Sequence, residues 1–303
     1  MPSSQSAVGS GSSENLHCLP ADFPVVALRA PDGACATVAL HGGHVLSWVP
    51  AGGSEMLYLS ARSGFAPGQA IRGGVPVIFP QFSDRGPLRR HGFARVLPWQ
   101  LIRRETGADS ASAVLRLEHG PQSQAFWPHV FVLELTVRVG AASLSLGLTC
   151  RNVGADAFSF HAALHSYFRV HDLAQCRLSG LQGLRYQDAL DHQDKLQAGD
   201  VEWGTGDLDR VYTRVPGPLL LSGLGRDGGG ATLLQIGQEG FEDVVVWNPG
   251  ADKCAALADM PADGWRHMAC VEAARIVRPV TLLPGEQWHG AQNLHCLTPS
   301  KHR

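Results

Sequence analysis

The stretch FVLELTVRVGAASLSLGLTC, residues 131–150, decides the fold class of this chain. Every second residue from Phe131 to Val139 is apolar, and the same alternation returns from Leu144 to Cys150 after a turn at 140–143. Alternation with a period of two places the apolar side chains on one face of a β-sheet. The two runs are therefore predicted to form an antiparallel hairpin.

Short runs of the same character occur on both sides of this hairpin, separated by turn residues among the 35 Gly and 19 Pro of the chain. These runs cover residues 114–118, 158–168, 231–236, 244–247 and 275–283. Helical patterns are scarce, and the best candidate covers only residues 251–260. The chain is therefore predicted to be all-β, with mostly antiparallel strands and few short helices.

The domain organisation follows from the lack of a convincing linker between residues 21 and 298. The glycine-rich segment GLGRDGGG, residues 223–230, is interpreted as the tip of a hairpin because its flanks have strand character, with a linker as the alternative. We predict a single domain over residues 21–298, a flexible N-terminal tail over residues 1–20 and a C-terminal tail over residues 299–303.

The composition narrows the class of protein and its location. Hydrophobic residues make up 44% and charged residues 17% of the 303 residues, which excludes a mainly disordered chain. No apolar run approaches the roughly 18–20 residues that span a bilayer, and residues 1–20 lack the pattern of a conventional secretory signal. The seven cysteines are scattered and never spaced C-x-x-C. We therefore expect neither a disulfide framework nor a thiolate zinc site, and we expect a cytoplasmic location.

The positive charge of the chain is concentrated in residues 61–104. Eight arginines and one acidic residue give this segment a net charge of +7, although the whole chain carries −2, a value that gives no reason to expect a nucleic acid or a membrane as partner. The segment has no Lys, and Arg offers a planar fork of donors that fits a carboxylate or a phosphate. Four of the arginines are interpreted as a solvated basic surface: Arg85, Arg89, Arg103 and Arg104.

Arg72 and Arg95 differ from these four because each lies among small or apolar residues, in IRGGVP (71–76) and HGFAR (91–95). A buried arginine needs an anionic partner, since an unpaired buried charge is costly. The residues alone leave two partners open, a bound anion or an internal carboxylate. The neighbouring glycines are expected to let the backbone approach a ligand closely.

Candidates for proton transfer are found among the 14 histidines and one glutamate. His161 and His165 stand at i, i+4, but their segment has strand character, which separates them by about 13 Å at roughly 3.3 Å per residue. HAALH also lacks the Glu of the H-E-x-x-H zinc motif, so we expect no metal site. Imidazole exchanges protons near neutral pH, and Glu272 ends an apolar stretch where burial would raise its pKa. Taken alone, a single histidine in a strand is more often structural than catalytic, and Glu272 is equally compatible with an ordinary position at a strand end.

Taken together and in order, seven motifs resemble a known family. They are IRGGVPVIFPQF (71–82), RHGFAR (90–95), LHSYF (164–168), DLDRVY (207–212), VVVWNPG (244–250), CVE (270–272) and TLLPGEQW (281–288). The set is similar to the hexose-6-phosphate mutarotases, also called glucose-6-phosphate 1-epimerases, among the aldose 1-epimerase-like proteins. The resemblance implies a galactose-mutarotase-like β-supersandwich, in agreement with the strand pattern.

The resemblance also implies roles for individual residues. The catalytic histidine and glutamate of the family fall on His165 and Glu272. The implied substrate-binding residues are Arg72, Arg90, His91, Arg95 and Asp209. Two positions depart from the family pattern: Arg90 replaces the Gln of some relatives, and Ala273-Ala274 follows Glu272 where a number of members have Pro-Gly. The second departure puts the aim of Glu272 in doubt.

The resemblance implies the interconversion of α and β anomers of hexose 6-phosphates, glucose 6-phosphate above all, and the residue types suit that chemistry. Glu272 is expected to act as the base and His165 as the acid in opening and closing the ring. No metal or organic cofactor is expected, and the expected assembly is a monomer. Two alternatives stay open: an aldose 1-epimerase acting on unphosphorylated sugars, and a carbohydrate-binding protein without catalysis. A pure binding module needs no proton-transfer pair, which argues against the second.

Overall fold

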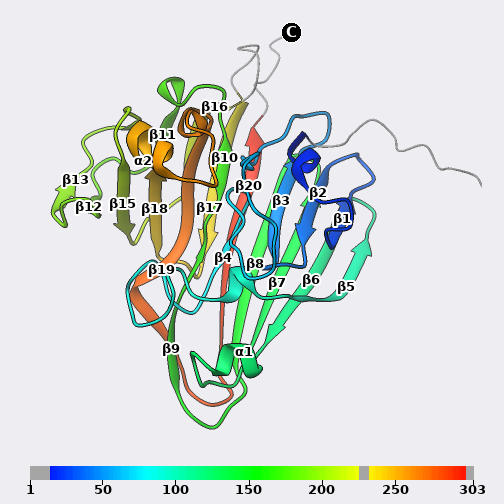
Figure 1. The fold of residues 1–303 in the computed structure, drawn as a ribbon. Helices are drawn as coiled ribbons and strands as arrows, with labels where there is room; N and C mark the ends of the chain where they lie inside the picture. The colour runs from blue at the N-terminus through cyan, green and yellow to red at the C-terminus, as the bar shows by residue number, and fades with distance from the viewer. Residues whose placement is uncertain (1–13, 225–231, 298–303) are drawn as a thin grey trace, which may run out of the picture.

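Three β-sheets contain all the named strands of the described chain. The computed structural model describes residues 14–224 and 232–297, and within these residues all pairs of named strands are antiparallel. The predicted hairpin is present, because β7 (Phe131–Gly140) pairs with β8 (Ser143–Asn152) along its whole length. The all-β prediction is confirmed (Figure 1).

The largest sheet has nine strands and contains the hairpin. Its strand order is β14 (Val201–Glu202), β11 (Arg177–Ser179), β16 (Leu219–Leu224), β17 (Thr232–Glu239), β20 (Gln287–Leu297), β8, β7, β6 (Ala111–Glu118) and β5 (Gln100–Thr106). A separate three-stranded sheet contains β1 (Val25–Arg29), β2 (Cys35–Ala39) and β3 (His44–Val49).

The eight-stranded sheet carries most of the candidate functional residues. Its strand order is β13 (Asp194–Leu196), β12 (Arg185–Asp188), β15 (Leu208–Thr213), β18 (Asp243–Asn248), β19 (Met268–Leu282), β9 (Phe158–Leu164) and β4 (Val77–Ile78), with β10 (Tyr167–Arg169) pairing to β19. The helices are short: α1 (Pro121–Gln124), α2 (Gly250–Ala256) and the 3-10 helices η1 (Glu14–Cys18), η2 (Ala94–Val96), η3 (Leu173–Gln175) and η4 (Gly264–His267).

The main hydrophobic core joins the eight-stranded and nine-stranded sheets. Leu135 and Leu146 of the nine-stranded sheet and Val246 and Ala273 of the eight-stranded sheet are fully buried in one cluster. Each buried aliphatic side chain of leucine or valine size contributes roughly 1.5–3 kcal/mol to the free energy of unfolding. Because side chains alternate along a strand, every second residue of β18 and β19 is left for the opposite face of the eight-stranded sheet.

That opposite face is where the candidate residues gather. Asp209 is paired with Trp247, and Val245 with Glu272, so these four side chains share a face. A small apolar cluster that includes Val245 and Ala163 supports the same face. The sheet is thus apolar against the main core and carries polar groups on its other side.

Three expected elements differ from the structure. The run 158–168 is broken between β9 and β10, because the amide of Ser166 turns back to bond the Leu164 carbonyl (3.0 Å). The helix expected over residues 251–260 ends at Ala256, because Leu257 is extended and Asp259 is held by other parts of the chain. Strands β16 and β17 flank the expected hairpin tip, most of which lies outside the described residues.

The N-terminal tail was expected to extend to residue 20. Residues 1–13 lie outside the described residues, but Glu14–Cys18 forms η1, and Leu16, Cys18 and Leu19 pack on an apolar cluster with Leu46 and Leu59. The packed part of the chain therefore begins before residue 21, because these apolar side chains have a cluster to cover. The expected C-terminal tail, residues 299–303, lies outside the described residues.

Candidate active site

A histidine and a glutamate meet on the polar face of the eight-stranded sheet. Glu272 projects from β19, and His165 follows β9, where its amide bonds the Pro76 carbonyl (3.1 Å). The distance from His165 Nε2 to Glu272 Oε1 is 3.3 Å, and the two side chains are 8% and 1% exposed. The structure thus brings together two residues that lie 107 positions apart in the sequence. Ala273 and Ala274 continue β19 in regular pairing, so the departure from Pro-Gly leaves Glu272 aimed at His165.

Burial controls the protonation of this pair. Burial raises the pKa of Glu272 well above its usual range, and the nearby charge of Asp209 acts in the same direction. Burial also lowers the pKa of His165 well below its usual range, and the charges of Arg95 and Arg72 add to this effect. The two groups therefore favour a state without net charge that holds one proton, and at 3.3 Å that proton is close to both.

Two polar atoms of the pair have no partner among the residues that the structure describes. They are Nδ1 of His165 and Oε2 of Glu272, and both are buried. A buried polar atom without a hydrogen bond costs about 1–3 kcal/mol. Such atoms are typical of a site whose hydrogen bonds are completed by a ligand.

Aromatic rings enclose the imidazole of His165. Tyr167 stacks on it, with ring centroids 4.7 Å apart and planes 10° apart. Trp247 and His91 meet it edge-on, at 5.9 Å and 5.6 Å. These surfaces keep water from the ring, which is the main cause of its lowered pKa.

Arg72 has the internal carboxylate partner that the sequence left open. Its Nε and Nη2 both lie 3.1 Å from Oδ2 of Asp259, and its Nη1 donates to the hydroxyl of Tyr167 (3.1 Å). Its side chain is 22% exposed. Arg72 is thus held in place by two partners, one of which stacks on His165.

Arg95 presents the opposite case. Its Nη2 donates to the backbone carbonyl of Arg90 (3.1 Å), and its buried Nε has no partner among the described residues. Nor does any described carboxylate lie within ion-pair distance of its guanidinium. Burial lowers the pKa of Arg95 to about 10, and the charge of Arg72 is among the further causes. A guanidinium desolvated in this way is a strong candidate to bind an anion.

Arg90 and His91, which precede Arg95, lie at different depths. Arg90 is 60% exposed and pairs with Asp84 (3.1 Å), so its charge lies at the surface. His91 is buried with a positive φ of 64°, and its Nδ1 accepts from the amide of Ser83 (3.3 Å). Burial lowers the pKa of His91 far below its usual range, so it is a neutral wall of the site beside His165.

Asp209 lies two strands away from Glu272 on the same face. Burial raises its pKa to about 6, with Lys253 opposing and Asp207 adding to the shift. Its charge raises the pKa of Glu272 in turn, which places the two carboxyl groups in one electrostatic environment. Asp209 is therefore available as a hydrogen-bond acceptor near the pair at neutral pH.

The glycines beside Arg72 and Arg95 allow two segments of main chain to pack closely against each other. This corrects the expectation that they are there to let a ligand approach the backbone. A Cβ on Gly74 would lie 2.2 Å from the Val45 carbonyl oxygen, and one on Gly92 would lie 2.1 Å from that of Phe79. Both residues have positive φ. They are required because two segments of main chain pass each other closely, and this packing fixes the two arginine-bearing loops.

The basic surface was expected to be solvated. Arg85 bonds Gln187 (3.1 Å) in an exposed contact, and Arg103 on β5 pairs with Glu105 (3.5 Å) with both side chains more than half exposed.

Three further residues of the site were not singled out from the sequence. Tyr167 and Trp247 lie within the motifs quoted above, and their aromatic character alone does not distinguish them from core residues. Asp259 has no sequence signal, because its role depends on Arg72, which lies 187 positions away.

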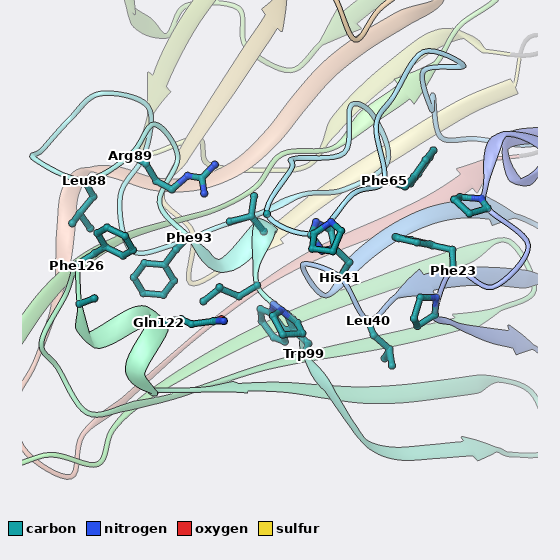
Figure 2. Close-up of a pocket in the computed structure, with 18 of the residues that line it drawn as sticks. Phe23, Leu40, His41, Phe65, Leu88, Arg89, Phe93, Trp99, Gln122 and Phe126 are labelled. Atoms are coloured by element: carbon teal, nitrogen blue, oxygen red, sulfur yellow. The ribbon is translucent and has the colours of Figure 1, made fainter.

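A separate groove lies along the 87–99 segment (Figure 2). It has a volume of about 1620 Å³ and is lined mainly by apolar side chains, among them Phe65, Phe93 and Trp99. Of its lining residues only Asp22 is acidic, and Nε2 of His41 bonds the Gln69 carbonyl (2.6 Å). Because none of the candidate site residues lines this groove, the proton-transfer chemistry belongs elsewhere.

Neither a metal cluster nor a membrane-spanning helix is found in the described part of the chain. Within residues 14–224 and 232–297, no three His, Cys, Asp or Glu side chains are grouped so that they could hold a metal ion. Over the same two ranges, no helix has the length and apolar character needed to cross a membrane.

Comparison with known proteins identifies the class to which this fold and site belong. The family model described as aldose 1-epimerase matches residues 24–295. The chain therefore belongs to the aldose 1-epimerase family, and it is an epimerase whose substrate is a small-molecule sugar.

Individual relatives narrow the comparison further. Proteins from Cenchrus ciliaris (35% identical, covering 89% of this chain and 84% of the relative) and Escherichia coli K12 (34% identical, 86% of each) are both named "Putative glucose-6-phosphate 1-epimerase". A crystal structure from Salmonella typhimurium, described as a "putative mutarotase", superposes with a TM-score of 0.82 at 30% identity over 90% of each chain.

Proposed function

We propose that this protein interconverts the α and β anomers of hexose 6-phosphates, with glucose 6-phosphate as the preferred substrate. The observation that carries the proposal is the buried contact of 3.3 Å between His165 and Glu272, with two arginines acting on the same imidazole. The names of the relatives from Cenchrus ciliaris and Escherichia coli support the phosphorylated substrate.

The reaction requires two proton transfers on opposite sides of one bond. Glu272 takes the proton of the C1 hydroxyl while His165 gives a proton to the ring oxygen; the bond between C1 and the ring oxygen breaks and a C1 carbonyl forms. Rotation about the C1–C2 bond presents the other face of the carbonyl. The hydroxyl formed from the ring oxygen then attacks C1, and the two residues return the protons in the opposite sense.

Binding of the substrate phosphate would favour the protonated form of His165 that can act as the acid. In the free protein, Arg72 and Arg95 disfavour the protonated form of His165. A phosphate dianion held by these arginines would cancel their charge and so allow the single proton of the pair to reside on His165. Binding energy from a group remote from C1 would thus support the reaction at C1.

Asp209, His91 and Arg90 complete the proposed site. Asp209 accepts a hydrogen bond from a sugar hydroxyl, because its carboxyl lies on the same face as Glu272. His91 walls the pocket beside His165, and Arg90 adds positive charge at the mouth, where its exposure is 60%. Trp247, which meets His165 edge-on, provides a flat apolar surface for the sugar ring.

The experiment that tests the proposal is anomer exchange spectroscopy on glucose 6-phosphate with the wild-type protein and Glu272→Gln. The variant keeps the shape of the side chain and removes the base, so we expect a fall in exchange rate of about 10²–10⁴-fold with substrate binding retained. Exchange near the wild-type rate would remove Glu272 from the mechanism.

A second candidate function is favoured by one observation. Arg72 already has a carboxylate partner, Asp259, which lowers its availability to a phosphate and suits an epimerase of unphosphorylated sugars. Rates measured side by side on glucose and glucose 6-phosphate separate the two: the first proposal requires a higher kcat/KM for the phosphorylated sugar.

We also propose a monomer in the cytoplasm that binds neither nucleic acid nor membrane, organised as one domain over residues 21–298 together with the packed segment before it. The seven cysteines all lie within the described residues and form no disulfide, and five of them are buried, which suits a reducing compartment. Size-exclusion chromatography with light scattering tests the monomer.

A further inference from the structure

We propose that Tyr167 is a positioning residue that couples the anion-holding Arg72 to the imidazole of His165, so that the two ends of the site act as one unit. This inference rests on the function proposed above and assigns a role to a residue that is not itself a proton-transfer group.

Two partners fix the position of Arg72. Its guanidinium is held on one side by Asp259 through Nε and Nη2, and on the other by the Tyr167 hydroxyl, which accepts from Nη1 at 3.1 Å. Five N–H groups belong to a guanidinium, so these bonds leave two to meet an anion in a fixed orientation. Removal of the hydroxyl would free one side of the fork to rotate.

His165 is held in position without a hydrogen bond at Nδ1 in the described part of the chain. A catalytic imidazole is ordinarily oriented by a hydrogen bond at the nitrogen that does not react. In the part of the chain that the structure describes, Nδ1 of His165 has no such partner. The ring is instead located by its Nε2 contact with Glu272 and by the Tyr167 ring stacked on it at 4.7 Å and 10°, with Trp247 and His91 packed edge-on. Stacking therefore replaces the orienting hydrogen bond.

Tyr167 is itself held by its backbone and by a neighbouring ring. Its amide bonds the Gly74 carbonyl (2.9 Å), its carbonyl accepts from the amide of Tyr58 (2.9 Å), and it pairs with Cys270 in β19. Its ring meets Trp247 edge-on at 6.0 Å, and only 3% of the residue is exposed. One buried side chain on a hydrogen-bonded backbone thus touches Arg72 at its hydroxyl and His165 at its face.

The two contacts of Tyr167 are made by different groups, the hydroxyl with Arg72 and the ring with His165, so substitutions can remove them separately. Tyr167→Phe removes the hydroxyl and keeps the stacked ring, whereas Tyr167→Leu removes both. Burial keeps the phenol protonated, since it raises the pKa of Tyr167 above its usual range. The matched control is Tyr212→Phe, which removes another buried tyrosine hydroxyl, bonded to Gln197 at 2.7 Å.

The kinetic test compares KM and kcat for glucose 6-phosphate and for glucose. For Tyr167→Phe we expect KM for glucose 6-phosphate to rise about tenfold, the value of one hydrogen bond to a charged group, with kcat and the values for glucose within about twofold of wild type. For Tyr167→Leu we expect kcat to fall by about tenfold or more on both sugars, because the imidazole loses the ring that locates it. Tyr212→Phe should lower the thermal midpoint and leave the kinetic constants unchanged. An unchanged KM in Tyr167→Phe, or an unchanged kcat in Tyr167→Leu, overturns the proposal.

A second measurement keeps the test independent of turnover. Inorganic phosphate is titrated into the wild-type protein and Tyr167→Phe while the imidazole resonances of His165 are followed by NMR. We expect phosphate to shift the resonances of His165 and raise its apparent pKa in the wild type, and to do so about fivefold less at equal phosphate in the variant, whose weaker anion binding leaves most sites empty. Equal responses would overturn the coupling. If the wild type fails to exchange the anomers of glucose 6-phosphate, the proposed function fails, and this titration still decides the coupling.

Discussion

Replacing Arg95 by alanine should separate the phosphate end of the substrate from its reacting end. The buried Nε of Arg95 has no partner among the described residues, and its Nη2 bonds a backbone carbonyl, that of Arg90, rather than a carboxylate. Burial has already lowered its pKa to about 10, which means that the free protein bears the cost of desolvating this charge. An anion that binds to Arg95 therefore forms hydrogen bonds with a group that folding has already desolvated, so binding does not have to desolvate the guanidinium again.

The expected magnitude follows from the number of hydrogen bonds that the variant cannot make to the phosphate. Two hydrogen bonds from a guanidinium to a phosphate contribute roughly 1.5–3 kcal/mol each. Arg72 remains in the variant and water enters the space of the missing side chain, so the lower limit of about 3 kcal/mol in total applies. At about 1.4 kcal/mol for each factor of ten, KM for glucose 6-phosphate should rise roughly 100-fold.

The assay is exchange spectroscopy with glucose 6-phosphate and glucose at several concentrations of each. Arg95→Lys keeps the charge and loses the planar fork, so its KM should lie between those of wild type and Arg95→Ala. Arg103→Ala removes a more than half-exposed arginine of the same basic segment and serves as the matched control. As an independent readout, inorganic phosphate at about 100 times its Kd should stabilise the wild type by about 2.7 kcal/mol, whereas Arg95→Ala, with a Kd about 100-fold higher, should gain only about 0.4 kcal/mol at the same concentration.

Equal loss of activity by Arg95→Ala on glucose and on glucose 6-phosphate would refute this account. Arg95 would then be structural, and the phosphate would have to bind elsewhere. Retention of the phosphate-dependent stabilisation in this variant would lead to the same conclusion by a route that needs no turnover.

Two further predictions concern stability. Because burial raises the pKa of Asp209 to about 6, the native state binds this proton more tightly than the unfolded state, so the stabilisation is complete below about pH 4 and is lost as the pH rises through 6. Urea unfolding should therefore show the wild type losing stability relative to Asp209→Asn between about pH 4 and 7, and parallel curves would contradict the assignment. Gly92→Ala places a methyl group 2.1 Å from the Phe79 carbonyl oxygen at a φ of 68°, and should lower the free energy of unfolding by about 2–4 kcal/mol. Gly33→Ala, at a φ of 96° with open space around it, should lower it by about 1–2 kcal/mol. Equal losses in the two variants would show that the backbone around Gly92 relaxes to admit the methyl group.

The strand pattern could be read from the sequence because alternation is a local property. Residues 131–150 predicted the hairpin of β7 and β8 with its turn in the right place, since one buried face imposes a period of two on each strand. The length of the helix after residue 250 was overestimated, because Asp259 is instead bonded to Arg72, in a contact between distant parts of the chain. Local pattern carries no information about such a contact.

Part of the candidate site could also be predicted from the sequence, because residue types and short motifs are local properties of the chain. His165 and Glu272 stood out as a titratable pair of types suited to proton transfer, and their motifs resembled those of a family. The surroundings that set their pKa values did not stand out, because Tyr167 and Trp247 have the composition of ordinary core residues in a strand protein. Their importance comes from the rings they place against His165 at 4.7 Å and 5.9 Å.

The amino-acid sequence by itself determined the fold class, the basic segment and the types of side chain available for chemistry, because composition and periodicity are properties of neighbours along the chain. Only the tertiary structure decided that Arg72 is paired with a carboxylate, that Nε of Arg95 has no partner among the described residues, and that a carboxyl and an imidazole 107 residues apart meet at 3.3 Å. The physical reason is the pairing register of β18, β19 and β9, which selects the side chains that share a face, together with the burial that their meeting produces.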